Sequence, residues 1–442
     1  MLHLEDHLRL HAARYPDKTA VIAGGECLTY ASLWRDVQAR AARLASEGLR
    51  PGGVHLMRAS QDASFLVDYF AVHLAGAVAV PLERDIPTGR FREIESLLAG
   101  ADIPDGTADI LFTTGTTGQS KGVMLSHKAI LADAENLVEA QGFSPGLTFI
   151  ISGPLNHIGS LSKVWPVILT GGTLHILDGL KELNAFFAIL ETPGLYATFQ
   201  VPAALRLLMS LAGDRLAACA PRIDFIETGA APLAQADMER LCQILPHTRL
   251  YNTYASTETG IVCTHDYNAG LCQAGCLGRP MKHSHVFITP EGTVACRGET
   301  LMTGYVGHPE LTASVLRGGT LYTNDRGHLD ADGRLYLLGR TDDVINVGGF
   351  KVSPPEVEEA ALSLPGVHDC VCVGVPHPVT GQQLKLLVVL DEGISLNKKN
   401  VARQLHARLE AYKVPLLYEQ VEAVRRTYNG KIDRKAYRIN EK

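Results

Sequence analysis

The part of this chain that most restricts its possible folds is a stretch rich in glycine and threonine at residues 113–122. It reads Thr-Thr-Gly-Thr-Thr-Gly-Gln-Ser-Lys-Gly and follows the apolar pair Leu111-Phe112. Its donors are Thr113, Thr114, Thr116, Thr117 and Lys121, and its glycines are Gly115, Gly118 and Gly122. The glycines let the backbone curl so that several N–H groups point inward, as anion-binding loops require. The spacing of a Walker A loop fits in no register, so the stretch indicates another kind of phosphate loop, with a polar surface turn as the alternative.

Composition favours a cytoplasmic enzyme with two or three domains. The chain has 442 residues, of which 46% are hydrophobic and 20% charged, as is usual for a globular protein. Its net charge of −6 gives no basic footprint for nucleic acid, and no apolar run reaches the roughly 18 residues needed to span a membrane. Acidic residues near the start argue against a secretory signal. Nine cysteines without the spacing of a disulfide scaffold fit a reducing compartment.

Helical and strand-like patterns alternate along most of the chain. Thr29 can cap a helix with apolar residues at helical spacing, residues 64–75 form a second apolar helix, and residues 78–81 form a short buried strand. Further helices are expected at 128–139 and 202–211. This alternation predicts the α/β fold class, with a large layered N-terminal domain of mixed sheets flanked by helices.

The last hundred residues have a different pattern. Strands at 370–375 and 384–390, followed by a helix with Val401 and Leu405 on one face, indicate a small α+β domain. The sequence Ser-Pro-Pro-Glu at 353–356 has the form of a capping box with proline in the first turn, which predicts that a helix begins there.

Several motifs, in order along the chain, resemble those of the adenylate-forming superfamily of acyl- and aryl-CoA ligases, peptide-synthetase adenylation domains and luciferases. The loop at 113–122 is similar to the superfamily's phosphate loop, with Ser120 where proline is usual. Residues 251–260 resemble its Tyr-Gly-x-Thr-Glu motif, residues 339–345 its hinge motif, and residues 430–431 its terminal Gly-Lys. The resemblance covers essentially the whole chain and is closest to a short acyl- or aryl-CoA ligase.

The resemblance implies where ATP binds. Tyr254 would stack on adenine, Asp325 would accept the ribose hydroxyls, and Glu258 would hold Mg²⁺ through a hard oxygen ligand. The implied ATP-binding residues are Thr113, Thr114, Gly115, Thr116, Thr117, Gly118, Lys121, Gly229, Ala230, Ala231, Tyr254, Asp325 and Arg340. The implied catalytic residues are Lys431, Glu258 and Thr257, with Thr257 donating to the α-phosphate and Lys431 brought in from the C-terminal end.

The resemblance also implies which residues bind the acid and which let the thiol reach it. Asn156, His157 and Thr228 would bind the acid, although a lone histidine is often structural. Gly348 and Gly349 would let the thiol arm of coenzyme A pass beside the backbone. Asp342 would be the hinge between an N-terminal domain of residues 1–341 and a mobile C-terminal domain of residues 342–442.

The activity implied by the resemblance has two steps. A carboxylic acid, a small aryl or acyl one, attacks ATP to give an acyl-adenylate and pyrophosphate, and the acyl group then passes to coenzyme A. ATP, Mg²⁺ and coenzyme A are the implied cofactors. One alternative is a stand-alone adenylation enzyme that loads a carrier protein, and another is a non-catalytic nucleotide-binding homologue. The phosphate loop also lies earlier in the chain than is usual, so part of the N-terminal region is shortened.

One group of cysteines suggests a further alternative. Cys263, His265, Cys272 and Cys276 could be drawn as zinc ligands, but their spacing matches no Cys-x₂-Cys knuckle. We therefore expect thiols in loops and core rather than a metal site.

Overall fold

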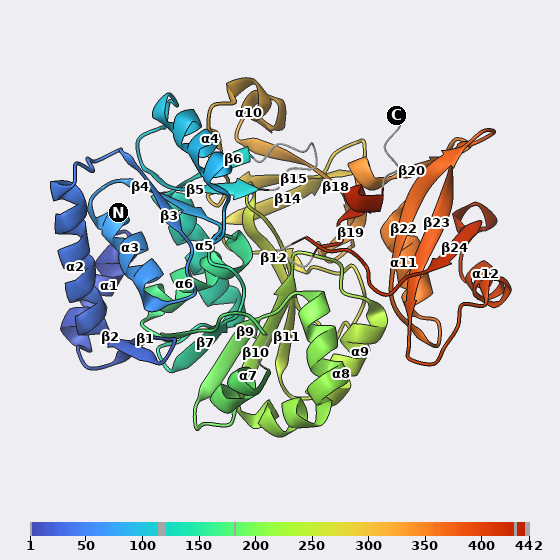
Figure 1. Ribbon diagram of the computed structural model, residues 1–442, viewed down its shortest axis with the longest axis horizontal. Coiled ribbons are helices and arrows are strands. Elements are labelled where there is room, and N and C mark those ends of the chain that lie inside the picture. Colours follow the sequence, from blue (N-terminus) through green and yellow to red (C-terminus); the bar gives the residue numbers. More distant parts are fainter. Residues whose placement is uncertain (1, 114–120, 181–182, 428–430, 438–442) are drawn as a thin grey trace.

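The computed structural model describes residues 2–113, 121–180, 183–427 and 431–437. Within these ranges the strands form four sheets, three in a large N-terminal domain and one in a small C-terminal domain (Figure 1). The small domain, orange to red in Figure 1, lies beside helices α8 and α9 of the large domain. The α/β class and this division into a large layered and a small α+β domain agree with the sequence prediction.

The largest sheet is the one that organises the site. Its strands, in order across the sheet, are β13 (Arg279–Pro280), β12 (Gly260–Asp266), β11 (Arg249–Ser256), β10 (Ile223–Gly229), β9 (Leu195–Phe199), β7 (Leu147–Ile151), β8 (Thr173–Ile176), β1 (Thr19–Ala23) and β2 (Glu26–Thr29). The strands from β11 across to β1 run parallel, and β12 and β2 pair antiparallel to them. Because helices cover a parallel sheet on both faces, most residues of these strands are buried.

Two further sheets complete the large domain. One has the order β16 (Gly304–Tyr305), β6 (Lys121–Ser126), β5 (Thr107–Thr113), β4 (Val78–Leu82) and β3 (Val54–Arg58). The other has the order β14 (Ser284–Ile288), β15 (Thr293–Gly298), β18 (Thr320–Leu329) and β17 (Leu316–Arg317), with β19 (Leu335–Arg340) paired to β18. The apolar run before the glycine-threonine loop is a strand, and it pairs with the strand that begins at Lys121.

Helices flank these sheets, and four of them match the helices expected after Thr29 and at 64–75, 128–139 and 202–211, although the last continues to Cys219. The flanking helices are α1 (Leu4–Arg14), α2 (Tyr30–Ser46), α3 (Ala63–Leu74), α4 (Thr88–Ala99), α5 (His127–Gln141), α6 (Ile158–Thr170), α7 (Leu183–Leu190), α8 (Pro202–Cys219), α9 (Gln235–Ile244) and α10 (Pro309–Val315). Thr29 is the N-cap of α2, and its hydroxyl accepts a hydrogen bond from the Ser32 amide at 3.2 Å. None of the described helices combines the length and apolar character needed to cross a bilayer.

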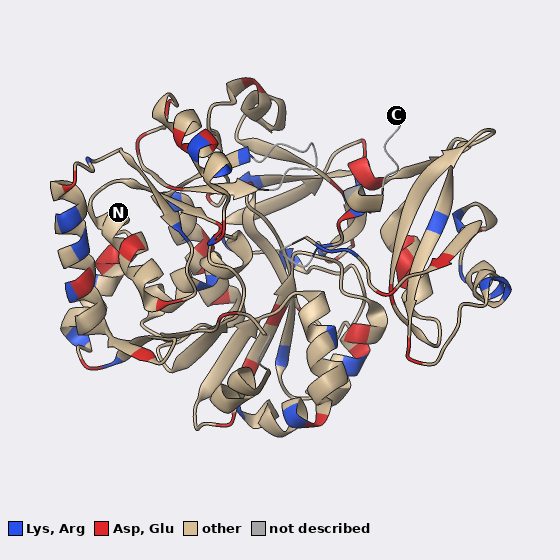
Figure 2. Ribbon diagram, viewed as in Figure 1, with Lys and Arg blue, Asp and Glu red and all other residues tan. Residues whose placement is uncertain are grey.

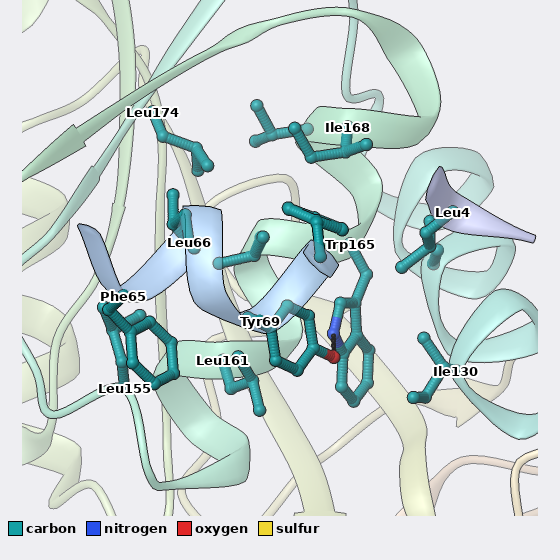
Figure 3. Packing of buried hydrophobic residues seen from close by; sticks show 14 of the residues in the cluster. Leu4, Phe65, Leu66, Tyr69, Ile130, Leu155, Leu161, Trp165, Ile168 and Leu174 are labelled. Atoms are coloured by element: carbon teal, nitrogen blue, oxygen red, sulfur yellow. Dashed lines mark hydrogen bonds between the residues drawn. The ribbon is translucent and has the colours of Figure 1, made fainter. Parts of the chain in front are cut away.

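The core of the large domain contains a buried polar chain among its apolar side chains. The Trp165 indole packs beside the Tyr69 ring (Figure 3), and its Nε1–H donates to the Tyr69 hydroxyl at 3.1 Å. That hydroxyl donates to Oδ2 of Asp109 at 2.8 Å, and Nε2 of His73 lies 2.9 Å from Oδ1 of the same carboxylate. Burial alone would lower the pKa of His73, but the Asp109 carboxylate outweighs it and raises the pKa. The network satisfies polar groups that would otherwise be costly to bury.

The small domain has its own sheet and core. Its strands have the order β21 (Phe350–Val352), β20 (Ile345–Val347), β23 (Gly381–Leu390) and β22 (Val367–His377), with β24 (Leu417–Gln420) on β23. Helices α11 (Pro354–Leu362) and α12 (Lys398–His406) pack on it. Helix α11 begins where expected, but the capping box is wrong, because the Ser353 hydroxyl donates instead to the Leu338 carbonyl and Glu356 pairs with Lys413.

Charged side chains of both signs are mixed over the two domains in the view of Figure 2. This distribution matches the small net charge of −6.

Candidate active site

Four parallel strands place candidate site residues at one edge of the large sheet. Asn156 and His157 follow β7, Phe199 ends β9, Gly229 ends β10 and Tyr254 lies near the end of β11. Neighbouring parallel strands bring their carboxyl ends to the same edge, which is where ligands of open α/β sheets bind. The structure therefore collects, at a single edge, residues that the sequence separates by about a hundred positions.

The turn after β10 is held in a conformation that side chains rarely adopt. Among the described residues, Ala230 is the one non-glycine residue with a positive φ, 67°. A Cβ atom at Gly229 would lie 2.8 Å from the Thr253 carbonyl oxygen, so only glycine fits there. Strain of this kind is usually found at binding sites, and the flat backbone leaves room for a planar ring. Gly229 is thus required by the geometry, whereas Ala230 carries the strain of a positive φ.

A fully buried ion pair lies below this turn. Nζ of Lys163, on α6, donates to Oε1 of Glu227, on β10, at 2.7 Å, and both side chains are at most 1% exposed. The ammonium also lies 5.3 Å from the centre of the Phe199 ring. That ring in turn touches the positions where Gly159 and Gly229 lack a side chain. The pair fixes α6 against β10 and so sets the distance between the expected acid-binding segment and the Gly229 turn.

The hairpin turn between β11 and β12 presents Glu258. The turn is closed by paired bonds, since the Ser256 amide donates to the Thr259 hydroxyl and the Thr259 amide to the Ser256 hydroxyl, both at 3.0 Å. Oε1 of Glu258 accepts a hydrogen bond from the Tyr305 hydroxyl at 2.9 Å. Nζ of Lys121 lies 5.3 Å from the centre of the Tyr305 ring. Tyr305 therefore links the carboxylate expected to hold Mg²⁺ to the lysine of the phosphate loop.

Tyr254, Asp325 and Arg340 form a second contacting group in the cleft. The Tyr254 hydroxyl donates to Oδ2 of Asp325 at 2.7 Å, and Nε of Arg340 lies 3.5 Å from Oδ1 of the same carboxylate. The positions of Asp325 and Arg340 follow from the pairing of β18 with β19, which sets them opposite one another. Burial and the neighbouring carboxylate raise the pKa of Tyr254 well above its ordinary value, so it stays a neutral donor.

Lys431 comes from the small domain, but charged residues of the large domain affect its pKa. Arg426 and Ile432 form a β-bridge, and the Thr427 amide donates to the Lys431 carbonyl at 2.7 Å, so Lys431 lies in a hairpin. Its side chain keeps solvent access, yet the surrounding protein lowers its pKa by desolvation and by the charge of Arg340. The carboxylates of Asp325 and Glu258 act in the opposite direction. Lys431 is thus close enough for the charges of all three residues to affect its pKa.

The structure relates to the predicted residues as follows. It brings Tyr254, Glu258, Asp325, Arg340 and Lys431 close together, and Thr113 pairs with Lys121 beside Tyr305. Their individual roles stay predictions. Thr257 is buried in the β11–β12 turn. Thr114, Gly115, Thr116, Thr117 and Gly118 lie outside the described residues.

The acid, thiol and hinge residues lie around this group. Asn156 and Thr228 are buried and His157 is the N-cap of α6. Gly348 and Gly349 occupy the exposed tip of the β20–β21 hairpin, with φ of 58° and 96°. Oδ2 of Asp342 accepts a hydrogen bond from the Asn324 side chain at 3.0 Å, in the segment between β19 and β20.

Two features of the site were not predicted from the sequence. Tyr305 is separated from Glu258 by 47 residues and has no recognisable motif around it. Lys163 and Glu227, 64 residues apart, each look like an ordinary charged residue. A charged residue inside an otherwise apolar helix or strand, as Lys163 is in α6, was the available signal.

Another group with metal-ligand chemistry lies away from the cleft. Among the described residues, His3, Glu5 and His127 have ligand atoms within 4.8 Å of one another. The two imidazole rings stack with centroids 4.2 Å apart and planes 7° apart. Lone pairs lie in the ring planes, so those of two parallel rings cannot meet at one ion, and we assign no site here.

A large layered α/β domain followed by a small α+β domain is the architecture of the adenylate-forming superfamily. The chain belongs to the family of AMP-binding enzymes, whose profile matches residues 8–102 and 98–306. The profile of the AMP-binding enzyme C-terminal domain matches residues 356–431.

Relatives match along almost the whole chain. It is 28% identical over 470 residues to a feruloyl-CoA synthase of Amycolatopsis sp, which covers 94% of each protein. It is 25% identical over 493 residues to surfactin synthase subunit 2 of Bacillus subtilis (strain 168), covering 96% of this chain and 14% of that protein. The solved structure of ATP-bound MatB from Rhodopseudomonas palustris shares the fold, with a TM-score of 0.90, 24% identity and coverage of 99% and 98%.

Proposed function

We propose that this protein is an ATP-dependent acid–thiol ligase that forms an acyl-adenylate and then transfers the acyl group to coenzyme A. The observation that carries the proposal is that Lys431, from the small domain, lies near enough to Glu258, Asp325 and Arg340 of the large domain for their charges to shift its pKa. A lysine placed there neutralises developing phosphate charge. Similarity to a feruloyl-CoA synthase along 94% of the chain supports coenzyme A as the acceptor.

In the first step, a carboxylate oxygen attacks the α-phosphorus of ATP. A new P–O bond forms, the bond to the bridging oxygen breaks, and pyrophosphate leaves. Because both reactants are anions, the site must reduce their repulsion, and Lys431, Lys121 and the donors of the phosphate loop provide fixed positive charge for this purpose. Asp325 and Arg340 orient the ribose, and the strained turn at Gly229 and Ala230 supports the adenine.

Glu258 has the chemistry needed to hold Mg²⁺. Its carboxylate is half-buried beside the cleft, and a hydrogen bond from Tyr305 fixes one of its oxygens. Hard carboxylate oxygens are the ligands Mg²⁺ prefers, and the ion, when bound, would neutralise phosphate charge.

In the second step, the thiol attacks the acyl carbonyl carbon and a C–S bond forms. The bond from that carbon to the phosphate oxygen breaks, AMP leaves, and the thiol proton is released to solvent. The thiol needs the space that Lys431 occupies in the first step, so we propose that the small domain, residues 342–442, rotates on the large domain, residues 1–341. Asp342 is the proposed hinge, since it lies in the short segment between β19 and β20. Rotation would bring Gly348 and Gly349, at the exposed hairpin tip, toward the thiol tunnel.

The acid we propose is a small aryl or acyl one, bound beside Asn156, His157 and Thr228. Similarity to a feruloyl-CoA synthase supports an aryl acid. All nine cysteines are unpaired thiols, which supports the proposal of a reducing, cytoplasmic setting.

A second candidate is an adenylation enzyme that loads a carrier protein. It is supported by the match of 96% of this chain to a 14% segment of surfactin synthase subunit 2.

An acid panel distinguishes these possibilities. Pyrophosphate release and hydroxamate trapping should identify an acid that the enzyme activates, and adding coenzyme A should convert the adenylate to a thioester with release of AMP. Adenylate formation without thioester, unless a phosphopantetheinylated carrier protein is supplied, would favour the second candidate. ATP binding without pyrophosphate release for any acid would contradict both.

A further inference from the structure

Helix α9 lacks a capping side chain of its own. It follows the Gly229 turn directly, and its N-cap residue, Ala234, has no group that could accept a hydrogen bond. The first amide of the helix, that of Gln235, donates instead to Oε1 of Glu359 at 2.8 Å. Glu359 lies on α11 of the small domain, so the small domain supplies the negatively charged cap that a helix N-terminus favours.

A second contact between the domains lies next to this cap. Arg206, on α8, pairs with Asp237 on α9, with Nε and Oδ2 2.9 Å apart. One of its terminal nitrogens donates to Oδ1 of Asp369, on β22 of the small domain, at 3.2 Å. The three side chains are 15%, 17% and 16% exposed, so solvent screens the charges less than at an open surface.

Asp369 connects this contact to the hairpin that carries Lys431. Its other oxygen, Oδ2, accepts a hydrogen bond from Arg426 at 2.6 Å. The backbone of Arg426 bridges to Ile432, the residue after Lys431. An unbroken line of contacts therefore runs from α8 of the large domain, through Arg206, Asp369 and Arg426, to the hairpin of Lys431.

We propose that Asp369 and Glu359 are positioning residues that hold the small domain on α8 and α9, with Lys431 at the nucleotide, during adenylate formation. This inference rests on the proposed function. It goes further by naming the contacts that must form for the first step and separate for the second.

The two domains can separate without leaving an unpaired buried charge in either of them. When the small domain leaves, Arg206 keeps Asp237 as a partner within the large domain, and Arg426 and Asp369 remain together within the small domain. The Gln235 amide passes to water. Because each domain retains a counter-charge, separation avoids the large penalty of an unpaired buried charge.

The test compares the two half-reactions in Asp369→Asn and Glu359→Ala. With the acid found by the panel, pyrophosphate release should fall about tenfold in each variant, a usual size for coupling between distant groups. Thioester formation from supplied acyl-adenylate should be unchanged or faster. The exposed Glu392→Gln, also in the small domain, is the matched control and should leave both rates unchanged. Equal loss of both half-reactions would overturn the proposal, because general damage to the fold predicts that result.

Pairwise coupling gives a sharper version of the same test. In the double variant Arg206→Gln with Asp369→Asn, the fall in adenylation should be smaller than the product of the two single falls, because one contact can be lost only once. Multiplicative falls would overturn a direct contribution of this ion pair.

Hydrogen exchange tests the docking without any substrate. In the intact wild-type protein, the segment 232–241, which contains the Gln235 amide, should exchange more slowly than in Glu359→Ala, while Glu392→Gln should match wild type. Equal exchange in wild type and Glu359→Ala would overturn the capping contact. Failure of every acid to release pyrophosphate would count against the proposed function instead, so the two failures are distinguishable.

Discussion

Lys121 and Lys431 lie near the same carboxylate, Glu258, but the chain holds them in opposite ways. Lys121 begins β6 and pairs with Thr113 of β5, so main-chain hydrogen bonds of a buried sheet fix it. Lys431 lies in a hairpin of the small domain, which reaches the large domain through side-chain contacts such as Arg206–Asp369 and Gln235–Glu359.

This difference divides the site into a permanent half and a removable half. Main-chain pairing in a sheet breaks only when the sheet unfolds, whereas partly exposed ion pairs are individually weak and can separate and reform. In the proposed mechanism, the large domain thus offers a prearranged nucleotide surface. In the same proposed mechanism, the small domain contributes a charge that is withdrawn between the two successive steps.

The largest expected effect comes from breaking the permanent half. Lys163→Met would leave Glu227 buried without its partner, and the free energy of unfolding should fall by about 3–5 kcal/mol. Denaturant unfolding followed by tryptophan fluorescence measures this, since Trp34 and Trp165 both lie in the large domain.

The matched control replaces both members of that pair. Lys163→Met with Glu227→Leu removes the uncompensated charge and should recover most of the lost stability. A single variant as stable as wild type would contradict the role assigned to the pair.

The second-largest effect is expected from a variant that restricts rotation of the small domain. Asp342→Pro fixes φ at the proposed hinge, so thioester formation from supplied acyl-adenylate should fall at least about tenfold while pyrophosphate release is largely kept. Asp342→Asn keeps the backbone free to rotate and should resemble wild type. Undiminished thioester formation in the proline variant would place the hinge elsewhere.

The smallest effect is expected from removing one hydrogen bond within the large domain. Tyr254→Phe removes the hydrogen bond to Asp325, and loss of about 1 kcal/mol should raise KM for ATP roughly fivefold with little change in kcat. Tyr251→Phe, on the same strand but bonded to Arg249, is the control and should leave KM unaltered. A change in kcat alone would mean that Tyr254 acts on the chemical step rather than on the bound nucleotide.

Local chemistry explains which features could be predicted from the sequence. The strand before the phosphate loop, the Thr29 cap and the order of the motifs depend on residues close together in the chain. Asp325 and Arg340 were predicted separately, and a simple antiparallel pairing of β18 with β19 brings them together.

Contacts between distant segments were not predictable in this way. Tyr305 with Glu258, Lys163 with Glu227, and Arg206 with Asp369 are separated by 47, 64 and 163 residues. The failed capping box at Ser353 has the same cause, because the hydroxyl is taken by the carbonyl of Leu338, which only the folded chain brings near. Sequence pattern predicts which segments bind the nucleotide, but it does not predict the long-range contacts that hold these segments in place.

The most direct test of this two-part site is Lys431→Ala, assayed separately for its two half-reactions. Pyrophosphate release should fall about 10²–10³-fold, the usual effect of removing one electrostatic donor from a prearranged site. Thioester formation from supplied acyl-adenylate should proceed as in wild type, because the lysine has left the cleft by then. An equal fall in both half-reactions would contradict the account.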